Sequence, residues 1–234
     1  ASSTASDPPM KSRSFPRSCL LALLGVIVPL LVSTPRLTAA GAVAVTVTDN
    51  KGAPVADAVV SLVRLDAPAT FTPPPAPVVV AQQGQEFDPY VTVITPGTRV
   101  NFPNQDNIRH QVYSLSKTKP FEIPLYGPGT EQSLLFERPG IVALGCNIHD
   151  WMSAYIVIVE TPHFQKTPAT GLARVADLPP GRYRLDVWHP RLAGESRREV
   201  VITAADSATQ TISVTLKPDR RLRRAPDGTG GGYK

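Results

Sequence analysis

The sequence predicts an all-β protein of β-sandwich architecture, and three observations support this fold class. Proline accounts for 25 of the 234 residues, which is too many for a helical bundle because proline breaks helix interiors. Short apolar runs separated by Pro-Gly turns recur through the centre of the chain, without an amphipathic helical stretch. Hydrophobic residues reach 42%, which is enough to bury a core and excludes a wholly disordered chain.

Residues 1–40 carry the pattern of a secretory signal peptide and its leader. Lys11, Arg13 and Arg17 precede an apolar run of about 14 residues, and small residues follow it. The run is shorter than the ~20 residues that span a bilayer, so a retained membrane anchor is the less favoured alternative. We expect cleavage after Ala40 or Ala42, export to the periplasm, and no stable membrane insertion afterwards.

The net charge of +5 first suggests an anionic partner such as nucleic acid. Removal of residues 1–40 takes away four positive charges and one negative charge, so the mature chain would carry +2. The segment from Lys217 onward holds six positive and two negative charges, which leaves residues 41–216 at −2. We therefore expect no nucleic-acid partner, and residues 218–234 read as a disordered basic tail rich in glycine.

Residues 41–66 read as two strands. Val43, Val45 and Val47 alternate with polar or small residues, a turn follows at 49–52, and a second apolar run covers 55–65. Residues 67–77 hold five prolines and read as an extended linker.

Residues 78–162 are rich in short strands separated by turns at 96–97, 128–129 and 139–140, which is the spacing of a β-sandwich. The strands expected here are Val78–Ala81, Tyr90–Thr95, Arg99–Pro103, Gln111–Leu115, Gln132–Glu137, Ile141–Cys146 and Ala154–Glu160. Residues 163–217 contain further short apolar runs, and strands are expected around 172–175, 182–188, 198–203 and 210–216.

Four side chains form a candidate metal site. Cys146, His149 and Met152 follow one another at Cys-x2-His-x2-Met spacing between two expected strands, and His110 lies on an upstream loop. Two imidazoles, a thiolate and a thioether suit both copper oxidation states, since imidazole favours Cu(II) and sulfur favours Cu(I). Zinc is the less favoured alternative because thioether is a poor zinc ligand. Once the signal peptide is removed, Cys146 is the only cysteine.

Residues 78–160 resemble the cupredoxins, the plastocyanin- and amicyanin-like blue copper proteins, and most closely a periplasmic type linked to methylamine utilisation. The matching residues are Phe87-Asp88-Pro89, Pro96-Gly97-Thr98, Val100 to Asn104, His110 and the Cys146–Met152 loop. The resemblance implies a Greek-key β-sandwich with one type 1 copper, held in plane by His110, Cys146 and His149 and axially by Met152. The residue after the first histidine is usually Asn in this family, and here it is Gln111.

The resemblance further implies a one-electron carrier, with redox partners docking near His149. The sequence shows no substrate-pocket motif, so we do not expect an enzyme. Ile108, Ile148 and Trp151 would form an apolar patch there, unless Trp151 packs internally. The alternative is a copper protein for delivery, storage or tolerance, and a metal-free interaction protein is the third possibility. Asp106 and Asp150 are expected to be solvated loop carboxylates, and His163 and His189 to be structural.

The two flanks resemble the halves of a carboxypeptidase regulatory-like domain, a second small β-sandwich. Residues 45–60 match its opening, and residues 170–183, which include Pro179-Pro180-Gly181-Arg182-Tyr183, match its second half. We hypothesise that the copper-binding segment is inserted into this sandwich, with two independent parts as the alternative. Insertion requires strands from 43–65 to pair with strands from 172–216.

Overall fold

The computed structural model describes residues 41–70, 72–194, 196–202 and 207–219. These residues form strands, turns and loops and no helix, so the predicted all-β fold class is confirmed. They belong to one compact unit, Leu37–Lys234, and no helix in this described part has the length and hydropathy to cross a membrane. The predicted signal peptide and residues 220–234 of the predicted tail lie outside the described residues.

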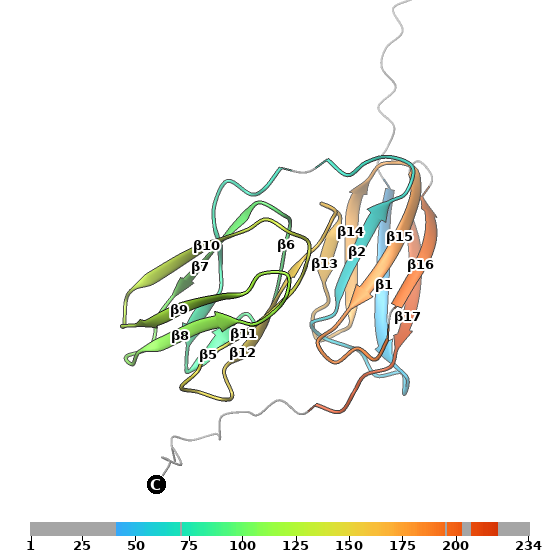
Figure 1. Cartoon of the computed structure of the whole chain (residues 1–234). Helices are drawn as coiled ribbons and strands as arrows, with labels where there is room; N and C mark the ends of the chain where they lie inside the picture. Colours follow the sequence, from blue (N-terminus) through green and yellow to red (C-terminus); the bar gives the residue numbers. More distant parts are fainter. Residues whose placement is uncertain (1–40, 71, 195, 203–206, 220–234) are drawn as a thin grey trace, which may run out of the picture. The chain divides into compact units, whose positions relative to one another are not determined.

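The central segment forms two sheets with one shared core (Figure 1). One sheet has the order β6-β12-β11-β8-β9 and the other β10-β7-β3, while β4 and β5 form a separate hairpin. The strands are β3 (Val78–Val79), β4 (Ala81–Gln83), β5 (Glu86–Asp88), β6 (Val91–Ile94), β7 (Thr98–Pro103), β8 (His110–Ser114), β9 (Phe121–Tyr126), β10 (Glu131–Phe136), β11 (Gly140–Gly145) and β12 (Ser153–Ile158).

Alternation along the strands builds that central core. On β7, Thr98, Val100 and Phe102 are fully buried and the residues between them are not, as expected where successive side chains point to opposite faces. Phe102 joins Phe136 of β10 and Val112 of β8 in one hydrophobic cluster. Cys146 and Met152 belong to the same cluster, so the candidate metal site is built at the margin of the core.

The flanking segments form two further sheets, with orders β14-β1-β17 and β13-β2-β15-β16. Their buried residues, among them Val45, Leu62 and Tyr183, make a second hydrophobic cluster. The strands are β1 (Gly41–Asp49), β2 (Val59–Arg64), β13 (Phe164–Lys166), β14 (Leu172–Leu178), β15 (Gly181–Trp188), β16 (Ser196–Ile202) and β17 (Ser207–Val214).

Strands from before and after the central segment pair with one another. β1 pairs antiparallel with β14 and parallel with β17, and β2 pairs antiparallel with β15 and with β13. Insertion requires this pairing. The domain boundaries themselves, and the likeness of the flanks to a regulatory domain, stay predictions.

Side chains of both strand groups share a third, smaller hydrophobic cluster. Val59 of β2 and Trp188 of β15 lie in it with Val91 of β6 and Val157 of β12. The rings of Tyr155 and Trp188 meet edge to face, with centroids 5.6 Å apart. The two groups therefore contact each other through apolar side chains.

Three observed strands lack a clear sequence signal. β9 contains Pro124, which weakens a strand assignment, but β9 is the edge of its sheet, where a missing N–H is tolerated. β5 and β13 are only three residues long. In addition, His110 was expected on the loop before β8, but it is the first residue of β8 itself.

Candidate metal centre

Three of the four predicted ligands lie together. His110 begins β8, Cys146 follows the last residue of β11, and His149 lies in the turn before β12. One donor atom from each of these residues lies within 4.8 Å of the other two. His110 and Cys146 are 0% and 4% exposed, while His149 is partly buried. The β11–β12 turn thus brings the donor atoms of Cys146 and His149 close to the donor atom of His110 on β8.

The spacing of these atoms fits a single metal ion. Sγ of Cys146 lies 3.7 Å from Nδ1 of His149. A nitrogen and a sulfur bound to one ion at about 2.0 and about 2.3 Å, at trigonal angles, would be about 3.7 Å apart. Cys146 forms no disulfide, so its sulfur is available as a donor.

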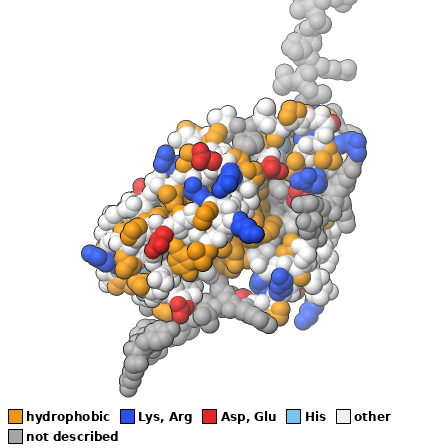
Figure 2. All heavy atoms as spheres, viewed as in Figure 1, with side chains coloured by type: hydrophobic (Ala, Val, Ile, Leu, Met, Phe, Trp, Pro, Cys, Tyr) orange, Lys and Arg blue, Asp and Glu red, His pale blue; other side chains and the backbone are white. Residues whose placement is uncertain are grey.

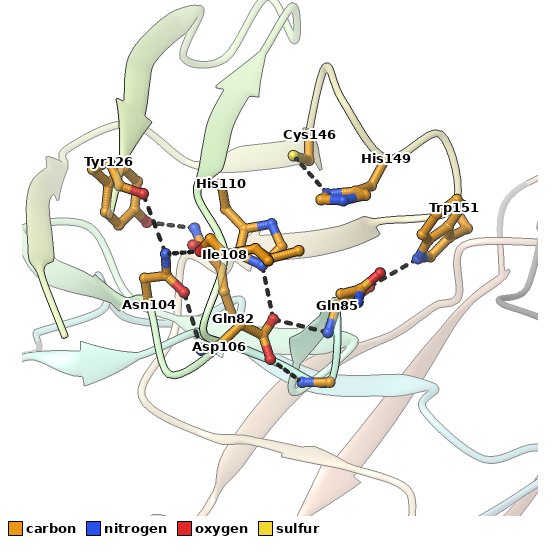
Figure 3. A network of polar contacts seen from close by, with 11 residues as sticks. Gln82, Gln85, Asn104, Asp106, Ile108, His110, Tyr126, Cys146, His149 and Trp151 are labelled. Atoms are coloured by element: carbon orange, nitrogen blue, oxygen red, sulfur yellow. Dashed lines mark hydrogen bonds and ion pairs between the residues drawn. The ribbon is translucent and has the colours of Figure 1, made fainter. Parts of the chain in front are cut away.

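The orientation of His110 leaves one ring nitrogen free (Figure 3). Its Nε2–H donates to Oδ2 of Asp106 over 2.7 Å, which makes Nδ1 the unprotonated nitrogen of the neutral ring. Nδ1 is buried and has no hydrogen-bond partner. Because buried polar atoms are nearly always paired, an orphaned imidazole nitrogen beside a thiol and a second imidazole fits a metal ligand.

Asn104 shapes the loop that leads to His110. Its buried amide donates to the carbonyl oxygens of Ile108 at 2.8 Å and Tyr126 at 3.2 Å. Its Oδ1 accepts from the backbone N–H of Asp106 at 3.1 Å. These bonds close residues 104–108 into a compact turn and place the Asp106 carboxylate under the imidazole.

Tyr126 supports the same loop from β9. Burial raises the pKa of its phenol, which therefore remains protonated and donates to the carbonyl of Phe102 at 2.9 Å. It also accepts from the amide of Gln82. These bonds join β9, β7 and β4 beneath the loop that carries His110.

The predicted role of Asp106 as a solvated carboxylate is wrong. Its side chain is 13% exposed, and besides His110 it accepts from the backbone N–H groups of Gly84 at 2.7 Å and Gln85 at 2.8 Å. These donors belong to the β4–β5 turn, more than twenty residues upstream. Sequence spacing alone gives no sign of such a contact.

The loop that carries Cys146 and His149 is a tight turn. The backbone N–H of Met152 donates to the carbonyl of His149 at 2.9 Å. Met152 is 2% exposed and shares a hydrophobic cluster with Cys146, which places the predicted axial residue in the core below the turn. Its role as a ligand stays a prediction.

Trp151 packs partly inward. Its ring lies against the central core and 5.2 Å from the ring of His149, centroid to centroid. Its indole N–H donates to the carbonyl of Gln85 at 2.9 Å. Ile148 is 49% exposed and Ile108 is half-buried, so Ile148 is the most exposed member of the predicted apolar patch.

Gln111, His163 and His189, which the sequence also singled out, each have a different partner. The amide of Gln111 donates to Glu122 across the β8–β9 pair at 2.7 Å. His163 lies edge to face with Tyr183, and Nδ1 of His189 accepts from the backbone of Arg191 at 3.1 Å. His163 thus contacts β15, His189 directly follows β15, and burial lowers the pKa of each histidine.

Comparison with known proteins gives partial likenesses. No protein-family model matches the chain, and no curated protein matches it. A Cu-containing nitrite reductase from Thermus scotoductus is 30% identical with a TM-score of 0.36, over 42% of this chain and 25% of that chain. The purple cupredoxin from Nitrosopumilus maritimus is 20% identical with a TM-score of 0.32, over 35% of this chain and 99% of that chain. A Cu(I) form of an amicyanin variant is 15% identical with a TM-score of 0.34, over 43% of this chain and 98% of that chain. The match thus spans only a quarter of the nitrite reductase, and less than half of this chain in each case.

Proposed function

We propose that this protein is a periplasmic type 1 copper protein that carries single electrons between redox partners. The observation that supports the proposal is the cluster of His110, Cys146 and His149, in which the buried Nδ1 of His110 has no hydrogen-bond partner. The donor set is mixed, with two imidazoles and one thiolate, and Met152 would add a thioether. Copper would supply a one-electron change between Cu(II) and Cu(I), and such a set serves both states.

The protein would contribute a fixed geometry. His110 is held by Asp106, the turn of His149 is closed by the backbone of Met152, and both lie against a packed core. Side chains held in this way move little when the charge at the centre changes, which favours rapid electron transfer. If Met152 completes the set, four protein donors leave no open position for a substrate, so we propose a carrier and not an enzyme.

The partner would dock beside His149. This is the least buried of the three donors, and the exposed Ile148 lies next to it in sequence. A small apolar contact suits the transient, low-area complexes of redox proteins. Acidic and basic side chains are interspersed on the face shown in Figure 2, without a large region of one charge.

Titration with Cu(II), followed by visible absorption spectroscopy, tests the proposal. We expect one copper per chain and an intense thiolate-to-copper charge-transfer band. Cys146→Ser should abolish the band while the metal-free variant keeps its fold by circular dichroism. A colourless protein that binds only Cu(I) would contradict electron transfer and favour copper delivery or storage.

A further inference from the structure

We infer that Asp106 and the Gly84–Gln85 turn of the β4–β5 hairpin act as one clamp, which fixes both histidine-bearing loops before a metal binds. Asp106 is in this view a positioning residue and not a ligand. The expected effect on copper binding rests on the proposed function. The clamp itself is a feature of the metal-free protein alone.

The first arm of the clamp runs to His110. The two carboxylate oxygens of Asp106 divide their contacts: Oδ1 accepts from Gly84, and Oδ2 accepts from Gln85 and from Nε2 of His110. The carboxylate therefore cannot turn away from the imidazole without losing two backbone donors.

The second arm runs to the other loop. The same Gln85 that donates its N–H to Asp106 accepts the indole N–H of Trp151 through its carbonyl. Trp151 lies against the ring of His149. A single peptide segment of the turn thus links His110 to the neighbour of His149, as Figure 3 shows.

The turn itself is firmly held. Gly84 and Gln85 both have positive φ, 64° and 59°, as in the tight two-residue turns that suit a β-hairpin. Gln82 and Phe87 pair across the hairpin, Phe87 is buried in the core, and the carbonyl of Gln82 accepts from the backbone of Gln105. Because the hairpin is anchored on both strands, it serves as a rigid support for the two loops.

The clamp has a chemical consequence at His110. A carboxylate that accepts from one imidazole nitrogen fixes the tautomer and raises the basicity of the other nitrogen. Nδ1 then becomes the stronger donor, which favours the more highly charged Cu(II) over Cu(I). Loss of the Asp106 charge should weaken Cu(II) binding more than Cu(I) binding.

Hydrogen exchange of the metal-free protein tests the clamp without any metal. The chain contains two tryptophans, and Trp151→Phe assigns the indole N–H signal of Trp151, with Trp188 as the internal reference. Because the path from Asp106 to Trp151 runs through the turn, Asp106→Ala should speed exchange at Trp151 by about tenfold or more through local opening. The signal of Trp188 should stay unchanged. Equal exchange at Trp151 in the wild type and Asp106→Ala would overturn the clamp.

Measured affinities for Cu(II) and Cu(I) test the expected effect of Asp106 on His110. Asp150→Asn is the control, because it also removes one negative charge, next to His149 in the sequence. We expect Asp106→Asn to weaken Cu(II) binding by about 10–100-fold. A tenfold loss for Cu(II) alone raises the one-electron potential by about 59 mV. Equal losses in the two variants would show a general charge effect and overturn the positioning role. If the wild type binds no Cu(II), the proposed function fails, and the exchange experiment still decides whether the clamp exists.

Discussion

His110 and Asp106, four residues apart, are joined by a 2.7 Å hydrogen bond that leaves Nδ1 of His110 buried without a partner. The bond defines the donor atom of the first predicted ligand before any metal is considered. It also shows that the loop before β8 is part of the site, so residues that shape this loop should affect both stability and metal binding.

Asn104→Ala should destabilise the metal-free protein by about 1–3 kcal/mol, because it takes a hydrogen-bond partner from the buried carbonyl of Tyr126 and from the partly buried carbonyl of Ile108. Urea unfolding at constant m-value measures the loss. Asn101→Ala is the matched control, since Asn101 bonds to Glu131 at the surface and its loss should stay within about 0.5 kcal/mol. Equal losses would show that Asn104 does not hold the loop.

Met152→Leu should keep the thiolate-to-copper band, since Cys146 stays in place, and should raise the preference for Cu(I) over Cu(II), because it removes a donor and Cu(I) tolerates fewer ligands than Cu(II). Its stability cost should stay below about 1.5 kcal/mol, since the two side chains have similar volumes. Ile156→Leu, in the same hydrophobic cluster, controls for repacking. Identical spectra and identical affinity ratios in the two variants would contradict a ligand role for Met152.

Local spacing was enough to predict that the donors of Cys146 and His149 lie together, because both residues lie in one turn, while the ligand role of Met152 stays a prediction. The all-β class followed from proline content and alternation, and the strand at β7 was placed almost to the residue. Asp106 and Gln85 could not be recognised in this way, since their contacts cross 21 to 66 residues of sequence and use backbone groups that every residue carries. β9 was missed because its proline is tolerated only at a sheet edge, and edges are known only once the sheet order is known.

Gly171→Ala should cost more stability than Gly52→Ala, although both glycines have positive φ, 72° and 82°. A Cβ at Gly171 would lie 2.6 Å from the carbonyl oxygen of Val47, whereas a Cβ at Gly52 would meet no heavy atom within 4 Å. The Gly52 variant should therefore show only the conformational cost of about 1–2 kcal/mol. Chemical denaturation measures both, and equal losses would mean that β1 and the β14 end are not packed this closely.

Stability should fall as the pH is lowered below 6.5, and His189 should account for part of the fall. Burial, and then the charge of Arg191, lower the pKa of His189 from its ordinary value of 6.5, while Asp57 and Asp219 oppose this more weakly. Below pH 6.5 the unfolded chain thus binds more protons than the native one, so stability rises with pH up to that value and gains nothing more from His189 above it.

The slope from one such proton is at most about 1.4 kcal/mol per pH unit. His189→Gln keeps an acceptor for the backbone N–H of Arg191 and cannot titrate, so it should flatten the dependence between pH 6.5 and the native pKa. His163 has its pKa lowered in the same direction, first by burial and then by Arg64, so the double variant with His163→Gln should flatten it further. Urea midpoints of the metal-free proteins at a series of pH values measure the slopes, and a slope unchanged in His189→Gln would refute the assignment.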